Sequence, residues 1–120
     1  MPSRAVEAAL RAPVSEIKAE LFKALGHPAR IRVLEVLSEE EHSVGELQPL
    51  VGIESSHLSQ QLGVLRRAGL VTTRKEGSSV IYALADPQLA DLLAVAKRLL
   101  ITSLAQHQDV LADLRTAADR

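Results

Sequence analysis

A short segment near the middle of the chain carries hydroxyl, amide and guanidinium side chains at helical spacing. Within residues 54–68, three leucines recur at i, i+4 and i+7 and therefore share one face of an α-helix. The opposite face is polar and almost free of acid, and it carries Ser56, Ser59, Gln60, Gly63 and Arg67. Side chains of these types hydrogen-bond to base edges and phosphates when a helix lies in the major groove of DNA. We therefore interpret this segment as a candidate recognition helix.

Other chemistries lack the residues that they need. The chain has no cysteine, which excludes disulfides, thiolate nucleophiles and thiolate metal ligands. It has no glycine-rich phosphate loop and no His-Glu-x-x-His motif, and its carboxylates fall in expected loops or on solvated helix faces. We therefore expect no enzymatic activity.

The formal net charge of −1 conceals a division of charge along the chain. Residues 55–82 hold four basic side chains and one acidic one, a local charge of +3. Residues 14–54 hold four basic and eight acidic side chains, a local charge of −4. A basic face on an otherwise acidic body is compatible with nucleic-acid binding, which depends on where charge lies.

Composition predicts one small, mainly α-helical domain. The chain has 120 residues, 47% of them hydrophobic, and only one Phe, one Tyr and no Trp, so its core must consist of aliphatic side chains. We expect a flexible N-terminal arm over residues 1–13, ended by Pro13, and a single domain over residues 14–120. No apolar run of 18 residues and no signal peptide is present, so we expect a cytoplasmic protein without membrane contact.

Helix signals place three elements before the candidate recognition helix. An apolar stripe begins near Val14 and ends at Gly26, and a second helix begins with Pro28 at its first position. Residues 38–42 are expected to form a solvated acidic loop. Ser43 and Glu46 match a capping box that opens a short helix. The glycine-containing segment 51–53 then forms the turn of a helix-turn-helix.

After Gly69 the hydrophobic period changes from that of a helix to that of a strand. Residues 70–75 and 79–84 alternate around Gly77, which predicts a β-hairpin with this glycine at its tip. Asp86 and Pro87 then begin a long last helix. Its apolar stripe needs a partner surface and consists of Leu89, Leu93, Ala96, Leu100, Leu104, Leu111 and Leu114.

Three blocks of sequence, in this order, resemble the ArsR/SmtB family of repressors. The segment LFKALGHPARIRVL over residues 21–34 resembles the part of that family before the helix-turn-helix. The segment LRRAGLV over residues 65–71 is similar to its junction between recognition helix and wing, and residues 77–84, ending in IYAL, are similar to its second wing strand. The resemblance covers roughly residues 20–91.

The resemblance implies a mainly α winged helix-turn-helix with a small β-hairpin wing and a long C-terminal helix. It also implies a homodimer that acts as a repressor, as members of this family commonly do. Its recognition helices are expected to enter successive major grooves of a palindromic operator, about 10 bp apart. The residues expected to contact double-stranded DNA are Ser55, Ser56, His57, Ser59, Gln60, Arg66, Arg67, Arg74, Lys75 and Ser79. The residues expected at the dimer interface are Val14, Ile17, Leu21, Leu89, Leu93, Ala96, Leu100, Leu104 and Leu111.

One position departs from the family within the recognition helix. Ser59 falls on the recognition-helix serine of the family, whereas Gln61 stands where a histidine is common. The departure affects the expected operator sequence and leaves the expectation of DNA binding intact.

The standard metal sites of the family lack their ligands here. The run from Ser43 to Glu46 has no thiol where one site has cysteines, and the other site is reduced to Asp86, with Leu99 and Thr102 in place of histidine or carboxylate. We expect no cofactor. Two alternatives stay open: a nickel- or zinc-responsive site of non-standard type, with His107 as its candidate ligand, and a separate effector protein that senses the signal.

The other three histidines have simpler interpretations. His27 precedes a proline at a helix start and is expected to be a cap or junction residue. His42 is expected to be solvated in the acidic loop. His57 is expected to contact phosphate or water from the recognition helix.

Overall fold

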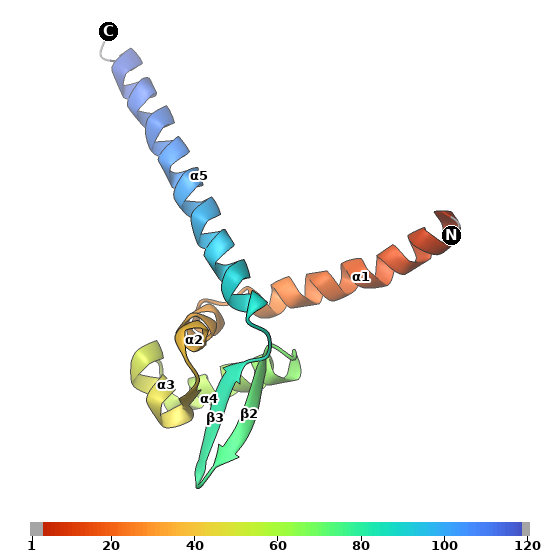
Figure 1. Ribbon diagram of the computed structural model, residues 1–120. Helices are drawn as coiled ribbons and strands as arrows, with labels where there is room; N and C mark the ends of the chain where they lie inside the picture. The colour runs from red at the N-terminus through yellow and green to blue at the C-terminus, as the bar shows by residue number, and fades with distance from the viewer. Residues whose placement is uncertain (1–3, 119–120) are drawn as a thin grey trace. The chain divides into compact units, whose positions relative to one another are not determined.

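A computed structural model describes residues 4–118 of the chain, and Figure 1 traces its elements in order. The structure divides into two compact units, one ending at Pro87 and the other beginning at Gln88. The predicted domain over residues 14–120 therefore comprises most of the first unit together with the second unit. No helix within the described residues has the length and apolar character that crossing a membrane requires.

The first helix, α1, spans Arg4–Leu25 and contains Pro13. The prediction that a segment ends at Pro13 is wrong, because the helix continues through the proline. Proline removes one backbone donor from a helix interior, but four of the eight residues before it are alanine, the strongest helix former. The predicted end at Gly26 is confirmed, since α1 stops at Leu25.

Three further helices follow at the predicted places, and the first two have the predicted caps. Helix α2 spans Pro28–Glu39, and its N-cap is His27, whose Nδ1 accepts the backbone N–H of Ala29 at 3.1 Å. Helix α3 spans Val44–Val51 and ends at Gly52, which has a φ of +75°. Glycine populates this left-handed region readily, so it can reverse the chain into α4, which spans Ser55–Arg67.

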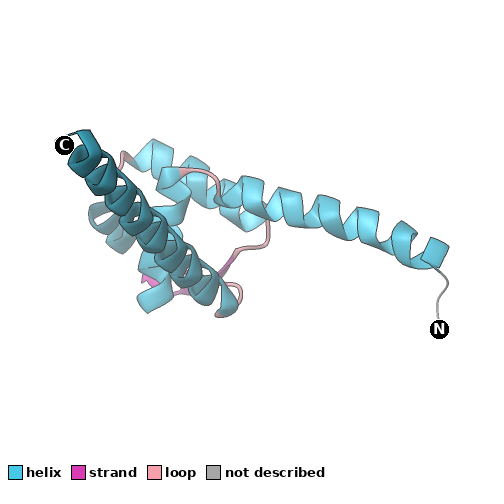
Figure 2. Ribbon diagram, turned by 90° about the horizontal axis from the view of Figure 1, so that it is seen from above, coloured by secondary structure: helices cyan, strands magenta, loops and turns pink. Residues whose placement is uncertain are grey.

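The wing contains three strands instead of the predicted two. Strands β2 (Val71–Glu76) and β3 (Ser79–Leu84) form the predicted hairpin, and Gly77 lies in its two-residue turn. The additional strand, β1 (His42–Ser43), pairs antiparallel with β3 on its other edge. Figure 2, coloured by secondary structure, shows that most of the first unit is helical.

The core of the first unit is aliphatic, as the composition predicts. The three leucines of α4 on the predicted inner face, Leu58, Leu62 and Leu65, are at most 2% exposed. Burying a leucine contributes about 1.5–3 kcal/mol, so these side chains hold α4 against the unit by one face. The other buried apolar residues of this unit are Leu25, Ala29, Val33, Leu34, Leu37, Leu47, Val51, Leu70 and Val71.

The second unit is a single helix, α5, over Gln88–Ala118. It begins one residue after Pro87, close to the predicted start. Large apolar side chains are exposed along it, namely Val95, Leu99, Leu100, Ile101, Leu104, Val110, Leu111 and Leu114.

Candidate nucleic-acid interface

Helix α4 presents its polar side chains to solvent because its leucines fix the opposite face in the core. The exposed side chains include five of the predicted DNA contacts on one helix: Ser55, Ser56, Ser59, Gln60 and Arg67. Arg66, next to Arg67 in the last turn, is also exposed. The exposed polar surface therefore runs from the first turn of α4 to its last.

The first turn of α4 contains an internal hydrogen bond that the sequence did not predict. Glu54 occupies the N-cap position and makes no capping hydrogen bond with its side chain. The hydroxyl of Ser56 instead donates to Oε1 of Glu54 at 3.1 Å. Ser56 must exchange this partner if its hydroxyl is to donate to DNA.

The side chain of Arg67 packs against Gly63 on the exposed side of α4. A Cβ atom built on Gly63 would lie 3.1 Å from Nη1 of Arg67. The guanidinium group therefore lies over the glycine, one turn back along its own helix. A shallow hollow lies beside these two residues, and its lining includes Ser59 and Gln60. The hollow combines hydroxyl, amide and guanidinium groups, which is the set that pairs with base edges.

Gln61 lies at the edge of this hollow, but its side chain is largely buried. It is 7% exposed, and its Oε1 accepts a hydrogen bond from Nη1 of Arg30 on α2 at 3.1 Å. The position at which the chain departs from the family therefore faces the interior of this unit. No local sequence pattern signals this contact, because Arg30 lies 31 positions before Gln61.

His57 lies half-buried on α4 beside His27. Their rings meet edge to face, with centroids 5.8 Å apart and an interplanar angle of 79°. Within residues 4–118, no group of three or more His, Asp or Glu side chains is arranged to hold a metal ion. Nδ1 of His107 donates a hydrogen bond within α5 to the carbonyl oxygen of Ser103 at 2.8 Å.

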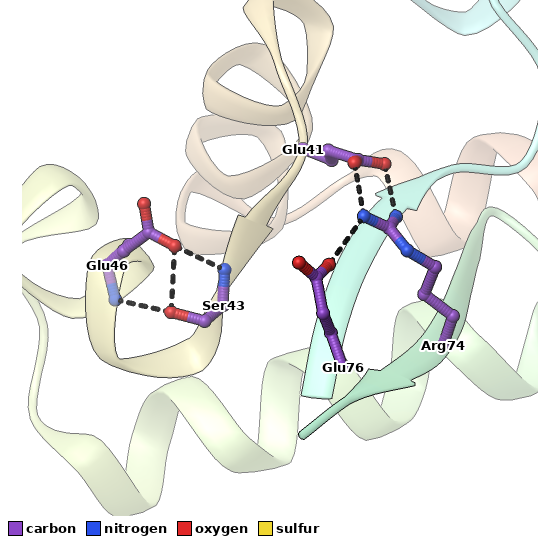
Figure 3. Close-up of polar contacts among 5 residues, drawn as sticks. All are labelled: Glu41, Ser43, Glu46, Arg74 and Glu76. Atoms are coloured by element: carbon purple, nitrogen blue, oxygen red, sulfur yellow. Dashed lines mark hydrogen bonds and ion pairs between the residues drawn. The ribbon is translucent and has the colours of Figure 1, made fainter. Parts of the chain in front are cut away.

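The wing carries an ion-pair cluster that the local charge count had missed (Figure 3). Arg74 on β2 donates from both terminal nitrogens to Glu41, at 2.5 Å each, and from Nη2 to Glu76 at 3.0 Å. The hydrogen bonds from Arg74 hold the pKa of Glu41 below its ordinary value, and Glu41 raises the pKa of Arg74. Two carboxylates thus contact this arginine, whereas Lys75 and Ser79 are exposed elsewhere on the same hairpin.

The acidic loop joins the wing through β1. His42, predicted to be solvated, is only 8% exposed, and that prediction is wrong because the strand pairs with β3 opposite Tyr82. Its Nδ1 lies 3.4 Å from Oε2 of Glu46. The next residue, Ser43, forms the predicted capping box: its hydroxyl accepts the N–H of Glu46, and the backbone N–H of Ser43 donates to the Glu46 carboxylate (Figure 3). The backbone N–H and then the hydroxyl of Ser43 hold the pKa of Glu46 below its ordinary value.

The predicted dimer residues differ in exposure. Leu89 is buried, and Leu21 and Leu93 are half-buried. The others are exposed: Val14, Ile17, Ala96, Leu100, Leu104 and Leu111. These six side chains lie on α1 and α5.

Comparison with protein families places the helix-turn-helix in a known group. A model described as a helix-turn-helix domain matches residues 25–74. The chain is 57% identical over 104 residues to Rv0081 of Mycobacterium tuberculosis, an uncharacterised HTH-type transcriptional regulator, and the match covers 86% of this chain and 91% of that protein.

Of two further relatives, one is named as an activator and the other as a homologue of a repressor. The transcriptional activator HlyU of Vibrio cholerae is 40% identical over 79 residues, 66% of this chain and 73% of HlyU. A homologue of the transcriptional repressor SmtB from Synechocystis is 38% identical over 74 residues, 62% of this chain and 56% of that protein.

Solved structures agree with the fold. The crystal structure of Rv0081 superposes with a TM-score of 0.73 at 56% identity and covers 79% of this chain and 96% of that one. The solution structure of Mb0332 from Mycobacterium bovis superposes with a TM-score of 0.72 at 28% identity and covers 81% of this chain and 90% of that one. Mb0332 is described as a homodimeric winged helix-turn-helix DNA-binding domain and as a possible ArsR-family regulator. With its helix-turn-helix, its hairpin wing and these relatives, the chain belongs to the ArsR/SmtB family of DNA-binding transcriptional regulators.

Proposed function

We propose that the chain regulates transcription as a homodimer that binds a palindromic operator through α4. The observation that carries the proposal is the exposed polar face of α4, which stands directly opposite leucines that are at most 2% exposed. Two such helices, related by a two-fold axis, would enter successive major grooves about 10 bp apart.

We assign the exposed polar side chains to two kinds of DNA contact, with base edges and with phosphates. Ser56, Ser59, Gln60 and Arg67 would contact base edges, because hydroxyl, amide and guanidinium groups recognise them in the major groove. Most affinity would come from phosphate contacts and counterion release. The residues proposed for phosphates are Ser55, His57, Arg66, Lys75, Ser79 and Arg74.

Arg74 would contact phosphate only after a change of partners. Its guanidinium group is engaged by Glu41 and Glu76 in the free protein. A phosphate that competes with them displaces two carboxylates from the same cation. We therefore assign Arg74 a smaller share of the affinity than Lys75, which lies exposed on the same strand.

Exposed apolar side chains on α1 and α5 support the homodimer. Ile17 is 68% exposed, Leu100 is 65% exposed and Leu104 is 63% exposed. Large apolar surfaces of this kind mark interaction sites on soluble proteins. A second copy would cover them on both helices, as the description of Mb0332 as homodimeric suggests. A separate effector protein is the alternative occupant, and a chain that stays monomeric at micromolar concentration in sedimentation would favour it.

We propose repression as the regulatory outcome and the cytoplasm as the compartment, where the DNA of a bacterial cell lies. One of the relatives described above is named as an activator and the other as a repressor homologue. Whether such a regulator activates or represses depends on where its operator lies relative to the promoter. A reporter driven by the promoter of the chain's own gene would decide: higher expression after deletion of the chain supports repression, and lower expression supports activation.

Fluorescence anisotropy on DNA from upstream of the chain's own gene tests operator binding. We expect saturable binding that resists competitor DNA and weakens steeply with salt. The variant Arg67→Ala should weaken specific binding by about 1–3 kcal/mol. Arg32→Ala, which removes an exposed arginine from α2, is the matched control and should bind as the wild type does. Equal losses in both variants would remove Arg67 from the base-contacting set.

A further inference from the structure

Arg30 connects three helices of the first unit through one guanidinium group. Its Nε donates to the carbonyl oxygen of Ala24 at 2.6 Å, and its Nη2 donates to that of Lys23 at 3.3 Å. Its Nη1 donates to Oε1 of Gln61 at 3.1 Å. Arg30 itself belongs to α2, its backbone acceptors belong to α1, and Gln61 belongs to α4. We call these four residues the Arg30 clamp.

The α1 side of the clamp is held by the chemistry of a helix terminus. The carbonyl groups of the last turn of a helix lack partners within that helix, and the end of the helix carries a partial negative charge. Lys23 and Ala24 are in the last turn of α1, so the cation of Arg30 satisfies their carbonyl oxygens and complements that charge. The guanidinium group therefore follows the end of α1 when α1 moves.

The α4 side of the clamp is held by burial. Gln61 is 7% exposed, and no buried side-chain nitrogen or oxygen atom among the described residues lacks a hydrogen-bond partner. Because the side chain of Gln61 is largely buried, its amide oxygen would lose a hydrogen bond that water replaces only in part if the N–H of Arg30 moved away. Gln61 therefore also follows the guanidinium group.

A movement of Gln61 also moves the exposed side chains of α4, because they belong to the same helix. Ser59 and Gln60 are exposed, and Gln61 comes next in the sequence. One residue corresponds to about 100° of rotation around an α-helix, so a displacement of Gln61 rotates or shifts the side chains that are proposed to contact bases. The leucines of α4 hold the helix in the core without direction-specific bonds, whereas the hydrogen bond to Gln61 depends on direction.

We propose that the Arg30 clamp is a positioning device that couples the orientation of α1 to that of the recognition helix. The inference rests on the proposed function, because it assumes that the exposed face of α4 contacts DNA. A rearrangement of α1 at the proposed dimer interface would then change operator recognition without any ligand on α4 itself. Arg30 and Gln61 are thus specificity-determining residues that do not touch DNA.

The test cuts the clamp at its two ends separately. Gln61→Met keeps the length and volume of the side chain but removes the acceptor, and Arg30→Lys keeps the charge at the end of α1 but cannot reach three acceptors. Each variant should lose about tenfold in specific operator affinity, with unchanged affinity for random DNA and an unchanged salt dependence. Gln61→Glu restores an acceptor for Arg30 and should bind close to the wild-type level.

A double-mutant cycle separates coupling from independent damage. Arg30→Lys should have little further effect in the Gln61→Met protein, because the link is already broken. The matched control pairs Arg30→Lys with Gln60→Met, which removes an exposed amide outside the clamp, and these two losses should add. Melting temperatures of all variants are measured alongside, and losses of specific and random DNA affinity in parallel with melting temperature would overturn the proposal.

Different results would contradict the clamp and the proposed function. A wild-type protein without specific operator binding would contradict the proposed function itself. A wild-type protein that binds its operator specifically, together with Gln61→Met and Arg30→Lys variants that bind it equally well, would overturn the clamp alone. Additive losses in the cycle would overturn it as well.

Discussion

Replacing Gly63 by alanine should raise stability and weaken operator binding at the same time. Gly63 lies inside α4, has no left-handed backbone angle, and is half-buried. Alanine in a helix interior is more favourable than glycine by about 0.5–1 kcal/mol. For a unit of this size, that gain corresponds to a rise in melting temperature of roughly 2–8 °C.

The new methyl group would meet only a flexible side chain. The Cβ atom would lie 3.1 Å from Nη1 of Arg67, and the other two nearest atoms also belong to the Arg67 guanidinium group. A movement of this group by a few tenths of an ångström restores ordinary contact, so the methyl group costs little in the free protein. The same movement takes the guanidinium group away from its position over the helix, which lowers operator affinity if Arg67 contacts bases from there.

Calorimetry and anisotropy on the same samples would measure the two effects. Gly63→Ala should melt higher in both the wild-type and the Arg67→Ala backgrounds, but it should weaken operator binding clearly only where Arg67 is present. A lower melting temperature for Gly63→Ala would refute the packing argument. An equal loss of affinity in both backgrounds would show that the methyl group itself, and not the displaced arginine, disturbs the DNA contact.

Three further predictions concern the core, the cap and the wing. Leu62→Ala should lower the free energy of unfolding by about 2–5 kcal/mol, measured by urea denaturation, because Leu62 is 2% exposed. Ser43→Ala should cost about 1 kcal/mol through the lost cap. The pKa of Glu46 is lowered in the folded protein, so its contribution is complete above its ordinary pKa of 4.5 and is lost as the pH falls below that value. The difference in melting temperature between the wild type and Ser43→Ala should therefore narrow in acid, because the hydroxyl of Ser43 loses its bond to the Glu46 carboxylate. Part of the difference should persist, because the bond from the backbone N–H of Glu46 to that hydroxyl does not titrate. A difference that stayed constant with pH would contradict the contribution of the carboxylate to the cap. Glu41→Gln should leave Glu76 as the one carboxylate in contact with Arg74 and so make this arginine more available to phosphate. The dependence of DNA affinity on salt should then steepen by up to about one unit per protomer. A salt titration of random DNA binding would measure this slope, and an unchanged slope would contradict the prediction.

Local signals predicted most of the elements of the first unit. Proline at the start of α2, the capping box at Ser43 and glycine at the hairpin tip act over a few residues, so the sequence contains all the information that they need. The leucine spacing of α4 likewise fixed which face is buried. The family resemblance and the polar face of α4 together indicated DNA binding, and the relatives confirm that assignment.

The features that sequence reasoning missed depend on contacts between distant residues. A two-residue strand such as β1 has no hydrophobic period, so its pairing with β3 could not be recognised. Arg74 was counted as a free positive charge because Glu41 lies 33 positions earlier in the chain. Glutamine is usually exposed, and the burial of Gln61 follows from a partner on another helix. The alanine-rich start of α1 outweighed Pro13, whose effect on a helix is local.

Strand β1 also determines where this chain can gain or lose residues during evolution. The register pairs His42 with Tyr82 and Ser43 with Ile81, and side chains alternate between the two faces of a strand. An insertion of one residue after Glu41 that shifted this register would turn the buried His42 outward and take Ser43 away from the start of α3. Insertions before Glu41 or in the turn at Gly77 leave both pairings in place. Length variation among close relatives is therefore expected at those two points and not within the segment that joins β1 to α3.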